Sequence, residues 1–131
     1  MKIVMAFGTF DSLHPGHLFY LREAKKHGKL VVVLARDRTV VEVKGKMPKY
    51  GEQERKQHLE TTGIPDQVVL GSEGDKYGVI EELAPDIICL GYDQKFFADR
   101  LEEELKKRGL HARIIRIPPY KEDIFKSSKL K

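Results

Sequence analysis

The chain lacks the features that mark several specialised classes of protein. It has a single cysteine, Cys89, in 131 residues, so no internal disulfide can form and nothing points to an oxidising compartment. No apolar stretch is long enough to cross a bilayer, and the apolar start "MKIVMAFG" is too short for a signal peptide. We therefore expect a soluble cytoplasmic protein with no membrane partner.

Neither sign of charge dominates. The 24 basic and 20 acidic residues leave a net charge of +4, and the two signs are interspersed along the chain. This mild excess favours polyanionic small ligands such as nucleotides, whereas a nucleic-acid partner is not expected because no basic stripe with interleaved aromatics is present. The length suits one domain, expected over residues 1–131, and no repeat, low-complexity segment or linker interrupts it.

Five apolar runs rich in β-branched residues recur along the chain. They lie at 2–7, 30–35, 67–71, 86–91 and 112–117. Because these runs lack polar alternation, they are typical of strands covered on both faces, as in a parallel sheet. We expect a right-handed connection between successive strands.

Helical patterns separate the runs. Residues 15–27 carry an apolar stripe and end in "KKHG", and a stripe of Phe97, Leu101 and Leu105 ends in "KKRG". Both endings place cations in the last turn and glycine at C′. Residues 52–60 and 79–83 supply the remaining crossovers.

Together these patterns predict an α/β fold with a single Rossmann-like, doubly wound sheet of five parallel strands and helices on both faces. Such sheets bind ligands beyond the carboxyl ends of their strands, where the strand order reverses. The loops after the first and fourth strands should flank that point.

The loop after the first strand reads "GTFDSLHPGH", from Gly8 to His17. Pro15 fits N1 of the next helix, where free N–H groups and the helix dipole favour a phosphate. His14 and His17, three residues apart, should project from the same side of that turn as donors, and Gly16 allows close approach of the backbone. Two other interpretations remain: a metal-binding pair without a third ligand at a set spacing, or one capping and one core histidine.

This loop resembles the G-T/S-F-D-x-x-H-x-G-H signature of the nucleotidylyltransferase superfamily. The resemblance implies transfer of a nucleoside monophosphate from a nucleoside triphosphate to a phosphorylated acceptor, with release of pyrophosphate. His14 and His17 would stabilise the charge on the departing pyrophosphate. A divalent cation, Mg²⁺, would be bound through the triphosphate, and no protein metal ligands are expected.

The resemblance implies further nucleotide contacts. Thr9 and Phe10 match the pair that frames the nucleotide and its phosphates. Lys44 resembles a catalytic loop lysine that reaches acceptor or triphosphate oxygens; it can also be read as a solvated loop lysine, with Lys46 as its substitute. Arg55 matches the arginine of an E-x-R-x-x-x-L-like helix, as a ligand contact or as an anchor for that helix.

Two later segments complete the expected site. Asp93, in "LGYDQ", resembles the acceptor that contacts ribose and base. Ser127 and Ser128, followed by Lys129, resemble a serine-bearing turn that binds the phosphates. Taken alone, the serine pair is only an N-cap signal.

The C-terminal segment separates the activities of the superfamily. It reads "RIPPYKEDIFKSSKLK" and lacks the Arg-Thr-x-Gly of cytidylyltransferases that use CTP and glycerol 3-phosphate. The segment "LGYDQ", Tyr120 and "SSK" resemble archaeal FAD synthases, which use ATP and FMN, although the cysteines near their final serines are absent here. Tyr120 would then contact the nucleotide. The resemblance also implies a homodimer.

FMN adenylyltransferase is the first interpretation of the function, and three alternative functions remain. They are a cytidylyltransferase acting on glycerol 3-phosphate or a similar small phosphate, a sugar-phosphate nucleotidylyltransferase, and a non-catalytic nucleotide-binding module. Cys89 lies within an expected strand and is interpreted as a small core residue rather than a nucleophile.

Overall fold

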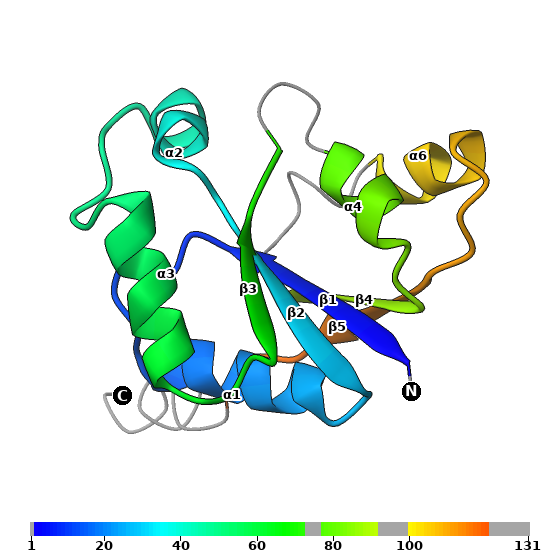
Figure 1. Ribbon diagram of the computed structural model, residues 1–131, viewed down its shortest axis with the longest axis horizontal. Helices are drawn as coiled ribbons and strands as arrows, with labels where there is room; N and C mark the ends of the chain where they lie inside the picture. Colours follow the sequence, from blue (N-terminus) through cyan, green and yellow to red (C-terminus); the bar gives the residue numbers. More distant parts are fainter. Residues whose placement is uncertain (1, 73–76, 92–99, 121–131) are drawn as a thin grey trace, which may run out of the picture.

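A computed structural model describes residues 2–72, 77–91 and 100–120 and contains a five-stranded parallel sheet between two layers of helices (Figure 1). In chain order the elements are β1 (Ile3–Gly8), α1 (Pro15–Lys25), β2 (Lys29–Leu34), α2 (Asp37–Lys44), α3 (Glu52–Thr61), β3 (Gln67–Leu70), α4 (Gly78–Leu83), β4 (Ile87–Gly91), α6 (Leu101–Lys107) and β5 (Arg113–Ile117). No helix in these ranges is both long and apolar enough to span a membrane.

The strand order is β3-β2-β1-β4-β5, and every neighbouring pair is parallel. The order therefore reverses between β1 and β4, as the sequence predicts. All five strands end at the same edge of the sheet, so the carboxyl ends of β1 and β4 lie beside each other at the expected ligand-binding position.

Each face of the sheet has its own apolar core. Residues of α1 and α3, such as Leu21 and Leu59, pack on one face, and residues of α4 and α6, such as Ile80 and Leu101, pack on the other (Figure 1). Cys89 of β4 is fully buried in the first core, and burial raises the pKa of its thiol to about 11. Because such a thiol stays protonated, Cys89 is the inert core residue that the sequence predicts.

One helix was not predicted. Helix α2 lies between the strand predicted over 30–35 and the helix predicted over 52–60, and Lys44 is its last residue rather than a loop residue. Its apolar residues are the β-branched Val40, Val41 and Val43, and so short an apolar cluster does not distinguish a helix of eight residues from other structure. Gly45, with φ of 78°, ends it in the left-handed conformation.

The two predicted glycine stops differ. Gly109 follows α6 with φ of 70°, as expected. Helix α1 ends at Lys25 with Lys26 as its C-cap, before the expected His27, so Gly28 lies one residue beyond C′ and not at C′ as predicted. Gly28 is required for another reason: a Cβ there would lie 2.3 Å from the carbonyl oxygen of Lys2.

Candidate active site

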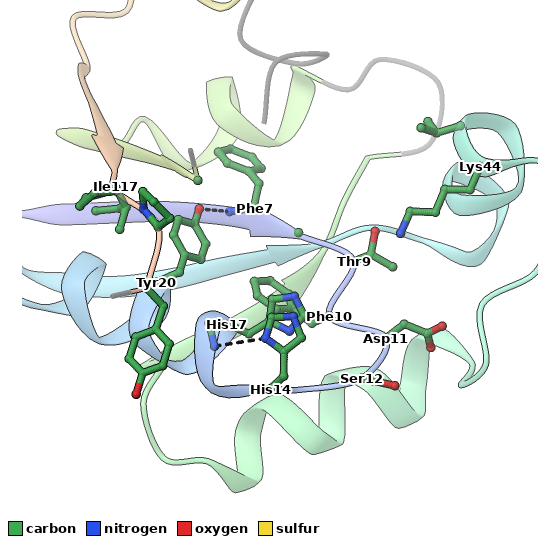
Figure 2. Close-up of a pocket in the computed structure, with 17 residues that line it drawn as sticks. Phe7, Thr9, Phe10, Asp11, Ser12, His14, His17, Tyr20, Lys44 and Ile117 are labelled. Carbon is green, nitrogen blue, oxygen red and sulfur yellow. Dashed lines mark hydrogen bonds between the residues drawn. The ribbon is translucent and has the colours of Figure 1, made fainter. Parts of the chain in front are cut away.

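The sheet opens between β1 and β4 at its carboxyl edge. β1 pairs with β2 along its whole length, but its last pair with β4 joins Ala6 to Cys89. At the next rung the Tyr20 hydroxyl from α1 lies between the strands. It accepts from the Phe7 N–H at 3.1 Å (Figure 2) and donates to the Cys89 carbonyl oxygen at 2.7 Å. The two strands thus separate while these backbone groups remain hydrogen-bonded.

A cavity of about 540 Å³ lies at this opening. The end of β1 and the loop that follows it, the first turns of α1, the end of α2, the last residue of β4 and the residues at and after the end of β5 line it (Figure 2). This volume suits a small-molecule ligand. The predicted site residues that line it are Thr9, Phe10, His14, Gly16, His17, Lys44 and Tyr120.

The two histidines lie together at the start of α1. Their rings stack with centroids 3.7 Å apart, so they do share one side of the turn (Figure 2). His14 is the N-cap, and its Nδ1 accepts from the Gly16 N–H at 3.1 Å. That N–H is therefore engaged, although the sequence suggested that the first turn would leave it for a phosphate.

The cap also fixes the tautomer of neutral His14. An Nδ1 that accepts a hydrogen bond carries no proton, so the ring proton is on Nε2. The capping interpretation thus applies to His14 but does not exclude a role as a donor, because Nε2–H is not used by the cap. His14 is exposed at the cavity, and His17 is half-buried beside it.

Arg55 lies beneath the site as an anchor. Its guanidinium is fully buried and donates to the carbonyl oxygens of Thr9, Ala35 and Tyr50 at 2.8–2.9 Å. It also pairs with the Asp37 carboxylate at 2.7 Å. Of the two interpretations of Arg55, this geometry matches the anchor, since the guanidinium joins the loops after β1 and β2 to the α2–α3 connection.

Asp11 is a site residue that the sequence analysis did not assign. It lines the cavity, and its carboxylate accepts from the N–H groups of Lys49 at 2.7 Å and Tyr50 at 2.9 Å. Although burial raises it, the pKa of Asp11 is lowered overall by these two hydrogen bonds and by the charges of Arg55 and Lys44. The sequence does contain a signal for Asp11, because this residue is the aspartate of the "GTFDSLHPGH" motif, three residues before His14.

The comparisons with known proteins agree with this geometry. Residues 5–131 match the cytidylyltransferase-like family. The chain belongs to that family. It is 49% identical over 121 residues to a protein named FAD synthase from Aciduliprofundum boonei, covering 92% of this chain and 80% of the relative. It is 48% identical to a FAD synthase from Methanosarcina barkeri, covering 93% and 87%.

A solved structure is also similar. The crystal structure of a lipopolysaccharide core biosynthesis protein from Thermoplasma volcanium has a TM-score of 0.85 and 45% identity, covering 92% of this chain and 98% of that one. The α/β architecture read from the sequence is thus shared with this relative.

The other site residues predicted for this cytidylyltransferase-like chain fall into two groups: those that the structure describes and those outside the described residues. Lys44, exposed at the end of α2, lines the cavity, whereas Lys46 does not. Half-buried Tyr120 also lines the cavity, and its ring centroid is 5.5 Å from that of Phe19. Pro15 begins α1 as predicted. The remaining predicted contacts lie outside the described residues: Asp93, Ser127, Ser128 and Lys129.

The described residues do not fit a resident metal. Within them, no group of three His, Cys, Asp or Glu side chains is placed to hold an ion. The Asp11 carboxylate at the cavity is already bound by two backbone N–H groups. The interpretation of His14 and His17 as a metal pair thus finds no third ligand in the described part of the chain.

Proposed function

We propose that this chain transfers AMP from ATP to FMN, forming FAD and releasing pyrophosphate. The observation that carries the proposal is the stacked imidazole pair at the N-terminus of α1, inside the cavity between β1 and β4. The N-terminus of a helix and a pair of hydrogen-bond donors are groups that bind the negatively charged oxygens of a polyphosphate. The choice of ATP and FMN is supported by relatives named FAD synthase that align over most of this chain.

The proposed reaction needs no covalent intermediate with the protein. A phosphate oxygen of FMN attacks the α-phosphorus of ATP in line, a new P–O–P bond forms, and the bond to the β-phosphate oxygen breaks. The electron pair leaves with pyrophosphate. Catalysis then consists of positioning and of stabilising the negative charge that develops on the leaving group.

The cavity supplies cationic and N–H donors for that charge. The Nε2–H of His14 and the half-buried ring of His17 would donate to the oxygens of the leaving pyrophosphate. Lys44, exposed at the opposite wall, would attract the phosphates of acceptor or nucleotide. Thr9, Gly16 and Tyr120 would frame the substrates, as would Asp93, Ser127 and Ser128 outside the described residues.

A divalent cation would accompany the triphosphate as part of the substrate, where it offsets phosphate charge. We also propose a homodimer, which sedimentation of the purified protein tests. A sedimenting monomer across the working concentration range would contradict it.

The decisive experiment measures pyrophosphate release over a matrix of triphosphates and acceptors. We expect release and FAD formation with ATP and FMN, and little release with CTP and glycerol 3-phosphate. Release only with CTP and a polyol phosphate, or only with a sugar phosphate, would replace FMN as the acceptor. Nucleotide binding without release for any pair would identify a non-catalytic binding module.

A further inference from the structure

Four aromatic rings form a column from the cavity surface to the sheet. The exposed His14 ring stacks on half-buried His17, with centroids 3.7 Å apart. The next ring is Phe10, edge-on to His17 at 5.2 Å and only 4% exposed. Tyr20, 8% exposed, stacks on Phe10 at 6.3 Å. The reactive end of the column is therefore the only part of it that is well exposed.

The buried end of the column is tied to the sheet. The Tyr20 hydroxyl accepts from the Phe7 N–H of β1 and donates to the Cys89 carbonyl oxygen of β4. These hydrogen bonds hold the hydroxyl where the two strands part, so the Tyr20 ring cannot shift without breaking them. Phe10 contacts the Tyr20 ring, His17 contacts Phe10, and His14 contacts His17, so each ring is positioned by the one below it.

Phe10 reaches its place at a conformational cost. Its φ is 49°, in the left-handed region that residues with a Cβ seldom adopt. Its ring also covers Gly8, where an added Cβ would lie 2.6 Å from Phe10 Cε2. Strain of this kind persists only where the surroundings enforce it, and it is concentrated at functional sites.

We propose that Phe10 and Tyr20 are positioning residues for the imidazole pair. Tyr20 sets the place of Phe10, Phe10 orients His17, and the stacked His17 limits the rotation of His14. The donors are thus aimed before the substrate arrives, so little reorganisation is needed as charge develops on the leaving group. This inference rests on the proposed nucleotidyl transfer, and it assigns Phe10 and Tyr20, which also line the cavity, a role in orienting the histidines.

The first test removes the Tyr20 hydroxyl. In Tyr20→Phe we expect kcat to fall about ten- to a hundredfold, the scale of a displaced catalytic group. The KM for ATP should change by less than about threefold, because ground-state contacts remain. The matched control is Tyr77→Phe, which removes a hydroxyl from a tyrosine 6% exposed in the core on the other face and outside the cavity lining. It should keep the wild-type kcat.

The second test reads the imidazoles directly. In ¹H–¹⁵N spectra of the free protein, we expect Tyr20→Phe and a second variant, Phe10→Leu, to shift or broaden the ring signals of His14 and His17. Tyr77→Phe should leave them unchanged. Melting temperatures establish that each variant is folded.

The outcomes separate the two proposals. If the wild type makes no FAD from ATP and FMN, the proposed function fails, while the imidazole spectra still decide the positioning role. If the wild type is active and both Tyr20→Phe and Phe10→Leu keep its kcat and its imidazole signals, the positioning role is overturned.

Discussion

Asp11 and Arg55 hold the backbone of Tyr50 from two sides. The Asp11 carboxylate accepts its N–H at 2.9 Å, and Arg55 Nε donates to its carbonyl oxygen at 2.9 Å. Arg55 also bonds the Thr9 carbonyl oxygen, two residues before Asp11. The connection between α2 and α3 is therefore fastened to the β1–α1 loop, and through it the end of α2, with Lys44, is held at the cavity.

We expect Asp11→Asn to loosen this fastening. The amide keeps one oxygen acceptor, but its NH₂ group cannot accept the second N–H. Hydrogen exchange at the Lys49 and Tyr50 amides should become about tenfold faster, the scale of one lost charge-assisted bond. Asp66→Asn is the control, since Asp66 accepts from the Leu30 N–H outside the cavity. Unaltered exchange in Asp11→Asn would show that the connection is held without this carboxylate.

Arg55→Lys should destabilise the fold while keeping the charge. A single ammonium cannot reproduce the planar fork that reaches three carbonyl oxygens and the Asp37 carboxylate. We expect the free energy of unfolding to fall by about 2–4 kcal/mol, because buried acceptors lose their donors. Urea unfolding measures this. The control is Arg38→Lys in the exposed ion pair of Arg38 and Glu42. There the free energy of unfolding should change by no more than about 0.5 kcal/mol.

His14→Ala and His17→Ala should each lower turnover by about two to three orders of magnitude, the scale of losing one donor to developing charge. Nucleotide affinity should change much less. Steady-state kinetics with ATP and FMN, together with ATP binding by calorimetry, separate the two quantities. Equal losses in both would mean that the imidazoles bind the ground state, and full activity in both variants would remove them from the proposed mechanism.

Acid should destabilise the fold partly through Asp66. The Leu30 N–H and the Lys25 ammonium lower its pKa below the ordinary value of 3.8. A folded-state pKa below the unfolded one contributes stability at pH above about 3.8, and that contribution is lost as the pH falls through the folded value. Asp11, with its lowered pKa, acts in the same direction.

The measurement is the melting temperature from about pH 7 down to about pH 3. Asp66→Asn should melt lower than the wild type at neutral pH, and the difference should shrink as the pH falls below about 3.8, because the wild-type carboxylate is then protonated first in the unfolded and then progressively in the folded state. A constant difference across the range would assign the effect of the substitution to something other than the charge of Asp66.

The sheet and its ligand-binding edge were predictable from local patterns. The five apolar runs match the strands to within one residue at each end. The inner strands are largely apolar because both of their faces are covered, whereas the edge strands β3 and β5 keep exposed polar residues such as Gln67 and Arg113. The start of α1 at Pro15 was equally predictable, because proline at N1 and the histidine pair are local signals. The same loop indicated phosphate chemistry before any geometry was known.

Other features were decided by tertiary contacts. Helix α2 is only eight residues long and its apolar residues are three closely spaced valines, a pattern that does not distinguish a helix from a strand or loop. Arg55 could be read as a ligand or as an anchor until its acceptors came together from positions 9, 35 and 50. Asp11 likewise finds its partners about forty residues away along the chain.

The physical reason is the same in each case. The partners of Asp11, Arg55 and Tyr20 are mostly backbone N–H and carbonyl groups, which nearly every residue carries and no sequence pattern distinguishes. Tyr20 and Cys89 are 69 residues apart, and only the parallel packing of β1 and β4 brings that carbonyl within 2.7 Å of the hydroxyl. Local patterns therefore predict the sheet and the identity of the donors, whereas long-range contacts select the backbone groups that hold those donors in place.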